Sequence, residues 1–189
     1  MAIEDAKRWN KKYQNNKIPD EPIELLKEYA SSIDAKTKEK NALDIACGMG
    51  RHSKYLASLG FKVEALDISS VAIDSLKNIQ NIEAKEVDFD KYSLEKSKYD
   101  LIVCVYFLKR SLFTQMIDAL KPNGILIMET FVEDKENERE PSNPDFLLKK
   151  GELEEVFSKK CQILHSKEYT SKDYRGFKSR KAQLVVKMV

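Results

Sequence analysis

The sequence has few of the residues that build disulfide frameworks and metal sites. Its 189 residues include three cysteines, two histidines and one tryptophan, and it has no C-x-x-C motif. Cys47, Cys104 and Cys161 are odd in number and widely spaced, so we expect reduced, buried thiols rather than disulfides, and we expect no metal site. This cysteine usage is typical of a cytoplasmic protein.

Excess charge and long apolar runs are also absent. Lysine and arginine number 33 against 31 acidic residues, and the net charge of +2 gives no electrostatic footprint for a nucleic acid or a membrane surface. No apolar run approaches the ~20 residues of a membrane span, and the N-terminus lacks an apolar signal core. We expect one domain over residues 1–189, with 1–35 as an N-terminal helical cap segment, acting as a monomer or homodimer.

Glycine is scarce too, which makes the position of two glycines informative. The chain has six glycines, yet Gly48 and Gly50 directly follow the apolar run ALDIAC. Glycine is used where a side chain would clash or where the backbone must turn sharply. Two glycines between a strand-like and a helix-like segment suggest a ligand that lies against bare backbone.

Strand-like and helix-like segments alternate up to residue 131. Helical spacing of apolar residues predicts helices over 22–33, 51–59, 70–79 and 111–120. The segments that read as strands are ALDIAC, KVEALD, IEAKEVD, YDLIVCVYFL and ILIMETF. This alternation predicts a doubly wound α/β fold with a mostly parallel sheet covered by helices on both faces.

The pattern changes after residue 131. The charged segment 132–150 predicts an exposed loop of the kind that often forms a lid. A short helix is expected at 151–158. The segments CQILHSKEYT and KAQLVVKM alternate in hydropathy and are expected to pair as an antiparallel C-terminal hairpin.

Acidic residues stand at the expected carboxyl ends of the strands, where ligands of parallel α/β sheets bind. Asp67 ends the second strand and is placed to accept hydrogen bonds from ribose hydroxyls. Asp88 ends the third strand and is expected to accept from an exocyclic amino group, with Phe89 against a base. Asp44, inside the first strand, would hold the glycine loop in shape or face a positive charge.

The kind of nucleotide follows from what the loop lacks. Ser53 stands where the dinucleotide fingerprint has its third glycine or alanine, and no G-K-[ST] motif exists. A nicotinamide-dependent oxidoreductase therefore fits poorly, although it stays a rival. The remaining ligand is an adenosine derivative without phosphates.

The stretch LDIACGMGRHSKYLASLGFKVEALDIS resembles the cofactor-binding core of class I S-adenosylmethionine-dependent methyltransferases. Its D-x-x-x-G-x-G pattern consists of Asp44, Gly48 and Gly50, with Ala46 where the family usually has glycine. The segments GMGRHS, ETF and NPDFLLKKGELEEVF are similar to the tellurite-resistance methyltransferase-like branch. The resemblance implies a Rossmann-like, seven-stranded sheet and S-adenosyl-L-methionine as the cofactor.

The resemblance also implies which residues contact the cofactor. Asp44 would lie near its amino group, Arg51 near its carboxylate or an anionic substrate, and Asp67 at the ribose. The implied cofactor residues are Asp44, Ala46, Gly48, Gly50, Arg51, Asp67, Ile68, Asp88, Phe89, Cys104 and Tyr106.

Five residues are candidates for the acceptor side: Trp9, Tyr13, Tyr106, Arg110 and Glu129. Trp9 and Tyr13 share a helix face and either pack in the core or form a flap over the sulfonium by cation–π contact. Arg110 alternatively begins a surface helix. No catalytic residue is assigned, because methyl transfer to a soft nucleophile needs positioning in a dry site rather than an acid or a base.

The favoured function is methyl transfer to a small-molecule acceptor, with a soft nucleophile such as a thiol or a metalloid oxyanion favoured. The absence of a separate substrate domain indicates a small acceptor. One alternative is an RNA or protein methyltransferase that uses a basic face around Lys178, Arg180 and Lys181. Another is a module that binds S-adenosylmethionine without turnover.

Overall fold

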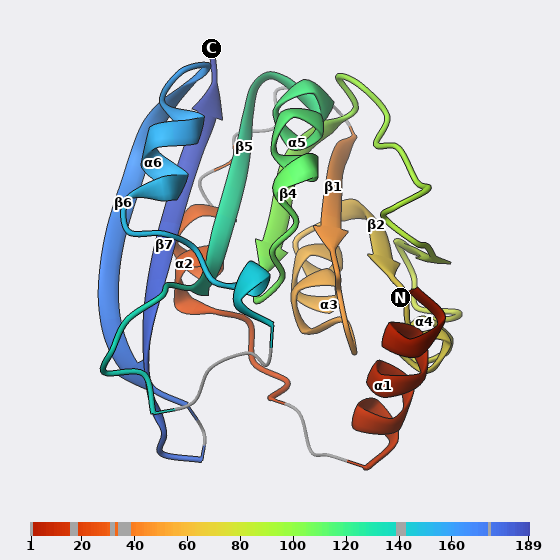
Figure 1. Ribbon diagram of the computed structural model, residues 1–189. Helices are drawn as coiled ribbons and strands as arrows, with labels where there is room; N and C mark the ends of the chain where they lie inside the picture. The colour runs from red at the N-terminus through yellow and green to blue at the C-terminus, as the bar shows by residue number, and fades with distance from the viewer. Residues whose placement is uncertain (1, 16–18, 31–32, 34–38, 139–142, 174) are drawn as a thin grey trace.

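The centre of the molecule is a seven-stranded sheet (Figure 1). The computed structural model describes residues 2–15, 19–30, 33, 39–138, 143–173 and 175–189. The sheet order is β3-β2-β1-β4-β5-β7-β6, with β7 antiparallel to both β5 and β6 and the other pairs parallel. The strands are β1 (Lys40–Ile45), β2 (Phe61–Asp67), β3 (Ile82–Glu86), β4 (Tyr99–Val105), β5 (Leu120–Phe131), β6 (Cys161–Lys172) and β7 (Lys178–Met188).

Helices cover both faces of the sheet, which confirms the expected doubly wound class and its C-terminal hairpin. Helices α5 and α6 pack on one face, and α2 and α3 pack on the other (Figure 1). The helices are α1 (Ala2–Asn15), α2 (Glu24–Ala30), α3 (Arg51–Ser58), α4 (Ser70–Asp74), α5 (Phe113–Ala119) and α6 (Glu152–Phe157), with short 3-10 turns at Arg110–Leu112 and Pro144–Phe146. Within the described residues, none of these helices has the length and apolar character needed to span a membrane.

Strand alternation explains why the central strands read as continuous apolar runs. In β4, Leu101 and Val103 point to the α2/α3 face, whereas Ile102 and Cys104 point to the α5/α6 face. Because both faces are covered, every position from Leu101 to Val105 is apolar. All three cysteines are free and buried, as the composition predicts.

Several element boundaries differ from the sequence-based expectation. The helix expected over 70–79 ends at Asp74, and Asn78 adopts a left-handed conformation (φ 66°) that no α-helix continues through. Strand β3 ends at Glu86, so the expectation that Asp88 ends it is wrong by two residues. The chain turns at Asp88, whose carbonyl accepts hydrogen bonds from the N–H groups of residues 91 and 92. Of the expected cap segment 1–35, residues 1, 16–18, 31–32 and 34–35 lie outside the described residues.

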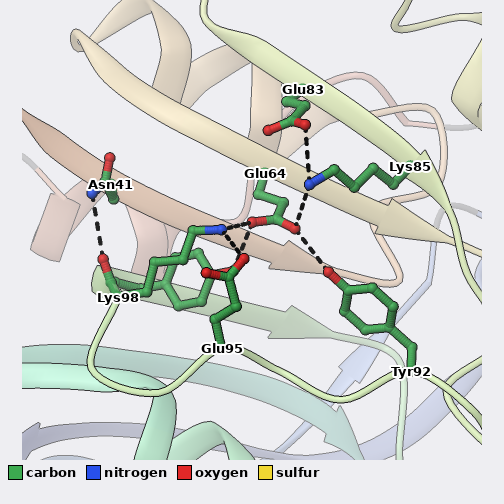
Figure 2. A network of polar contacts seen from close by, with 8 residues as sticks. Asn41, Glu64, Glu83, Lys85, Tyr92, Glu95 and Lys98 are labelled. Carbon is green, nitrogen blue, oxygen red and sulfur yellow. Dashed lines mark hydrogen bonds and ion pairs between the residues drawn. The ribbon is translucent and has the colours of Figure 1, made fainter.

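The connection from β3 to β4 has no helix, and a buried carboxylate anchors it instead. The Glu64 side chain on β2 is 5% exposed and accepts four hydrogen bonds (Figure 2). The donors are Lys85 Nζ (3.0 Å) and Tyr92 Oη (3.0 Å) on one oxygen, and Lys98 Nζ (2.6 Å) and Tyr99 Oη (2.7 Å) on the other. Burial alone raises the pKa of Glu64, but these donors outweigh it and lower the pKa to about 2.

Candidate cofactor and acceptor site

The loop between β1 and α3 is held in an unusual backbone conformation. Ala46, Gly48 and Gly50 all have positive φ angles, of 55°, 54° and 75°. A Cβ atom on Gly50 would lie 2.3 Å from a methyl carbon of Leu76, and one on Gly48 would lie 2.9 Å from the Tyr13 hydroxyl. Glycine at both positions avoids the strain of a positive φ and leaves room for the side chains of Leu76 and Tyr13.

Asp67 connects this loop to the loop that follows β2. Its carboxylate accepts hydrogen bonds from the backbone N–H groups of Gly48 (2.8 Å) and Ser69 (2.9 Å). Ser69 in turn caps α4 by accepting from the N–H of Ala72. The Asp67 side chain is buried, and burial raises its pKa, whereas these two hydrogen bonds act in the opposite direction.

Asp44 is the second buried carboxylate of the site. It is 1% exposed, and Ser53 Oγ donates to its Oδ2 across 2.6 Å. Burial raises its pKa to about 7, and the neighbouring negative charge of Asp67 adds to this effect. Ser53 is thus a partner of Asp44. In the sequence, Ser53 was noticeable because it stands where the dinucleotide fingerprint has its third glycine or alanine.

Helix α1 lies beside α4, close to the carboxyl ends of β1 and β2 (Figure 1). Asn10 attaches it: Ser69 Oγ donates to Asn10 Oδ1 (2.5 Å), and Asn10 Nδ2 donates to Ser70 Oγ (3.1 Å). Tyr13 lies over Gly48, and its ring stacks on Trp9 at 5.5 Å between centroids. Burial, followed by the charge of Asp67, raises the pKa of the Tyr13 hydroxyl.

A polar network lies at the carboxyl ends of β4 and β5. Tyr106 follows β4 in a left-handed conformation (φ 57°), and its hydroxyl donates to Glu129 Oε1 across 2.7 Å. Glu129 Oε2 also accepts from Tyr169 Oη (3.0 Å) and Gln183 Nε2 (2.7 Å). Lys181 Nζ donates to the Tyr106 hydroxyl across 3.0 Å.

The structure therefore brings three predicted residues together and adds three that were not predicted for this site. One of the three, Lys181, was expected on a basic face but is buried. The Arg51 guanidinium lies 5.6 Å from the centroid of the Tyr106 ring, and Tyr106 contacts Glu129. The additional members are Lys181, Tyr169 and Gln183. No local sequence pattern assigned them to this site. Lys181 and Gln183 lie on the face of β7 that also carries the fully buried Val185.

Other predicted site residues have local partners in the structure. Arg110 donates to both carboxylate oxygens of Glu152 and to the carbonyls of residues 145 and 147. Phe89 packs on Phe107 with 5.4 Å between ring centroids. Cys104 is fully buried, Ile68 follows Asp67 half-buried, and the Asp88 carboxylate accepts from the N–H of residue 90. Contacts of these residues with a cofactor or acceptor stay predictions.

The comparison with known families decides the family. Residues 36–180 match the family model described as a methyltransferase domain. The chain belongs to the class I S-adenosylmethionine-dependent methyltransferases. This assignment confirms the expectation from the glycine loop, and with it S-adenosyl-L-methionine as the cofactor.

Individual relatives of this methyltransferase are distant. Ribosomal protein L11 methyltransferase of Campylobacter concisus is 35% identical over 56% of this chain and 38% of its own length. Malonyl-[acyl-carrier protein] O-methyltransferase 2 of Ilyobacter polytropus is 29% identical over 70% of this chain and 59% of its own. The chain thus spans between 38% and 59% of the length of these two relatives.

Among solved structures, TehB from Haemophilus influenzae superposes with a TM-score of 0.73 at 22% identity. The match covers 97% of this chain and 67% of that one. At this identity the likeness shows the fold, including the antiparallel C-terminal strands.

The buried carboxylates of this methyltransferase fit its cofactor. Within the described residues, neither Asp44 nor Asp67 forms an ion pair, although both are at least 96% buried. Burying such groups is costly without a positive partner, and S-adenosylmethionine carries a sulfonium and an ammonium. In the same described part of the chain, no group of three or more His, Cys, Asp or Glu residues is arranged to hold a metal ion.

Proposed function

We propose that this methyltransferase transfers the methyl group of S-adenosyl-L-methionine to a small-molecule acceptor bound beside Tyr106. A soft nucleophile such as a thiol or a metalloid oxyanion is the favoured acceptor. The observation that carries the proposal is a pair of buried carboxylates, Asp44 and Asp67, beside the backbone of Gly48 and Gly50. Among the described residues neither carboxylate forms an ion pair.

The chain's own residues would hold the cofactor as follows. Asp67 keeps acceptor capacity beyond its two backbone bonds and is assigned to the ribose hydroxyls. Asp44, ionised, faces the ammonium, and the backbone of the glycine loop approaches the methionine part. The bound cofactor supplies an electrophilic methyl group on sulfur.

In this proposal, the rate enhancement comes from positioning the two reactants and from excluding water. Helix α1 covers the site through Tyr13 and Asn10 and keeps the reacting atoms away from water. Loss of positive charge on sulfur in the transition state favours such a dry site. Fixed orientation of two reactants contributes about 7–11 kcal/mol, so a soft acceptor needs no general base. Glu129 is already bonded to three donors and holds Tyr106 in place.

The relatives support both small and large acceptors. The Ilyobacter relative is named for a malonyl group on an acyl-carrier protein. A Schizosaccharomyces pombe relative is named as a ubiquinone biosynthesis O-methyltransferase. Both names indicate that a small chemical group receives the methyl group. The name of the Campylobacter relative indicates a protein, so a macromolecular acceptor is the second candidate. Action in the cytoplasm, as a monomer or homodimer and without a nucleic-acid partner, completes the proposal.

Two measurements test the proposed function. Calorimetry with S-adenosylhomocysteine should show saturable binding, whereas NADH should give none. Incubation with S-adenosylmethionine and a panel of thiols, selenite and tellurite should then release S-adenosylhomocysteine. If S-adenosylhomocysteine does not bind, the proposed cofactor site is refuted. If it binds but no acceptor is methylated, the non-catalytic binding module is favoured. Methylation of a protein or RNA fraction alone favours the macromolecular candidate.

A further inference from the structure

Lys181 is a buried lysine at the end of the site where the acceptor is proposed to bind. It is 7% exposed, and its register partners on β5 and β6 are Phe131 and Tyr169. Its ammonium lies 4.9 Å from the centroid of the Tyr106 ring and donates to the hydroxyl of that residue. Burial lowers its pKa, and the charges of Glu129 and Asp173 act against this without direct contact.

The ammonium of Lys181 retains hydrogen-bonding capacity. An ammonium has three N–H donors, and among the described residues Lys181 has one side-chain hydrogen-bond partner, the Tyr106 hydroxyl. Within the described residues, no carboxylate lies within ion-pair distance of it. A buried cation without a carboxylate partner is stabilised best when a ligand from solution brings a negative charge to it.

A second cation lies on the same tyrosine. The Arg51 guanidinium is 5.6 Å from the centroid of the Tyr106 ring, and its hydrogen bond is a long one, 3.4 Å to the carbonyl of Glu21. The described residues provide no ion pair for Arg51 either. Two positive groups thus flank a side chain that is 37% exposed and able to meet a ligand.

The carboxylate of this network, Glu129, already has hydrogen-bond donors of its own. Glu129 accepts from Tyr106, Tyr169 and Gln183. The Tyr106 proton is directed to Glu129, so the donors left for a ligand are the N–H groups of Lys181 and Arg51. The acceptor end of the site is therefore rich in cationic donors.

We propose that the acceptor carries an anionic group, and that Lys181, assisted by Arg51, binds this group and selects for it. The inference rests on the proposed function and adds the substrate class. The anionic group is distinct from the attacking atom, because a cation bonded to the nucleophile would reduce its reactivity. In a mercaptocarboxylate, Lys181 holds the carboxylate. The thiol first loses its proton to solvent water. A lone pair of the thiolate then forms the new S–C bond, the methyl C–S bond of the cofactor breaks, and its electron pair stays on the cofactor sulfur, which becomes a neutral thioether.

A matched pair of thiols tests this inference. 3-Mercaptopropionate and 3-mercaptopropanamide share the thiol and differ in the charge of the other end. Calorimetry on the complex with S-adenosylhomocysteine measures their binding without turnover, with selenite as a second anion. We expect the acid to bind at least about tenfold more tightly than the amide to the wild-type complex.

Three variants test whether Lys181 causes the preference for the acid over the amide. Lys181→Gln should remove most of the preference for the acid, and Lys181→Arg should restore it. Lys187→Gln, at the other end of β7, should keep it. Equal binding of acid and amide to the wild-type complex, or a full preference in Lys181→Gln, overturns the inference. S-adenosylhomocysteine binding is measured first for each protein, so failure of the proposed function is recognised separately.

Discussion

The carboxylate of Asp67, the last residue of β2, and the backbone N–H of Gly48, in the loop after β1, are joined by a hydrogen bond of 2.8 Å. The residue assigned to the ribose therefore also shapes the loop assigned to the methionine part. Binding of the ribose and binding of the methionine part are coupled, because any change at Asp67 affects both.

Removing this carboxylate should weaken cofactor binding strongly. Asp67→Ala loses the bond to Gly48 and the expected ribose bonds, and hydrogen bonds to a charged group contribute about 1.5–3 kcal/mol each. We expect an S-adenosylhomocysteine affinity at least about tenfold lower by calorimetry. Asp74→Ala, which removes an exposed partner of Lys77, is the control and should bind as the wild type does. Unchanged affinity in Asp67→Ala refutes the ribose assignment.

The raised pKa of Asp44 predicts that cofactor binding depends on pH. Its pKa is raised from 3.8 to about 7, so without ligand its contribution to stability is greatest below 3.8 and is lost as the pH rises through about 7. A ligand ammonium favours the ionised form. S-adenosylhomocysteine affinity should therefore fall about tenfold from about pH 8 to about pH 6, with proton release measurable by calorimetry in two buffers.

The matched variant for this prediction is Asp44→Asn, which keeps the size and can still accept from Ser53. It should bind more weakly at pH 8 and show a flatter pH profile. A wild-type profile as flat as that of the variant would mean that Asp44 does not face the ammonium.

Local sequence patterns predicted the parts of the molecule that depend on periodicity and on glycine. The apolar runs of β1 and β4, the loop with Gly48 and Gly50, and the hairpin of β6 and β7 all follow from such patterns. The pairing of Glu129 with Gln183 and of residue 131 with Lys181 depends on the antiparallel register of β5 and β7. No local pattern encodes that register, and so the buried lysine was not assigned to the site.

The cluster around Glu64 should make stability sensitive to acid. The pKa of Glu64 is lowered from 4.5 to about 2, so its contribution is present above about pH 4.5 and is lost as the pH falls through 2. Glu64→Gln weakens four charge-assisted hydrogen bonds, and we expect a loss of about 2 kcal/mol at pH 7. Calorimetry should show a melting temperature about 4–8 °C lower.

The difference between Glu64→Gln and the wild type should shrink as the pH falls below 4.5. Glu83→Gln serves as the control, because this carboxylate pairs with the same Lys85 but is 70% exposed. Its melting temperature should stay within about 2 °C of the wild type. An equal loss in both variants would show that burial of Glu64 is not what matters.

Arg110 has a role in the structure that differs from the one expected at the acceptor. Its bonds to Glu152 and to the carbonyls of residues 145 and 147 fasten the segment before α6. Arg110→Gln should increase amide hydrogen exchange over residues 143–152 and leave acceptor KM unchanged. Lys96→Gln, which breaks an exposed pair with Asp118, is the control. A selective rise in acceptor KM without faster exchange would support the substrate role instead.

Asn10 should determine how firmly α1 covers the site. Asn10→Ala removes its hydrogen bonds to Ser69 and Ser70, at about 1 kcal/mol each. We expect amide exchange across α1 to rise several-fold, while exchange in β1 and β4 stays constant. Trp9 is the only tryptophan, so its fluorescence reports on the same helix. Asn15→Ala, which loses a bond to the carbonyl of residue 11 on the same helix, is the matched control. Equal protection of α1 in both variants would show that contacts other than those of Asn10 hold the helix in place.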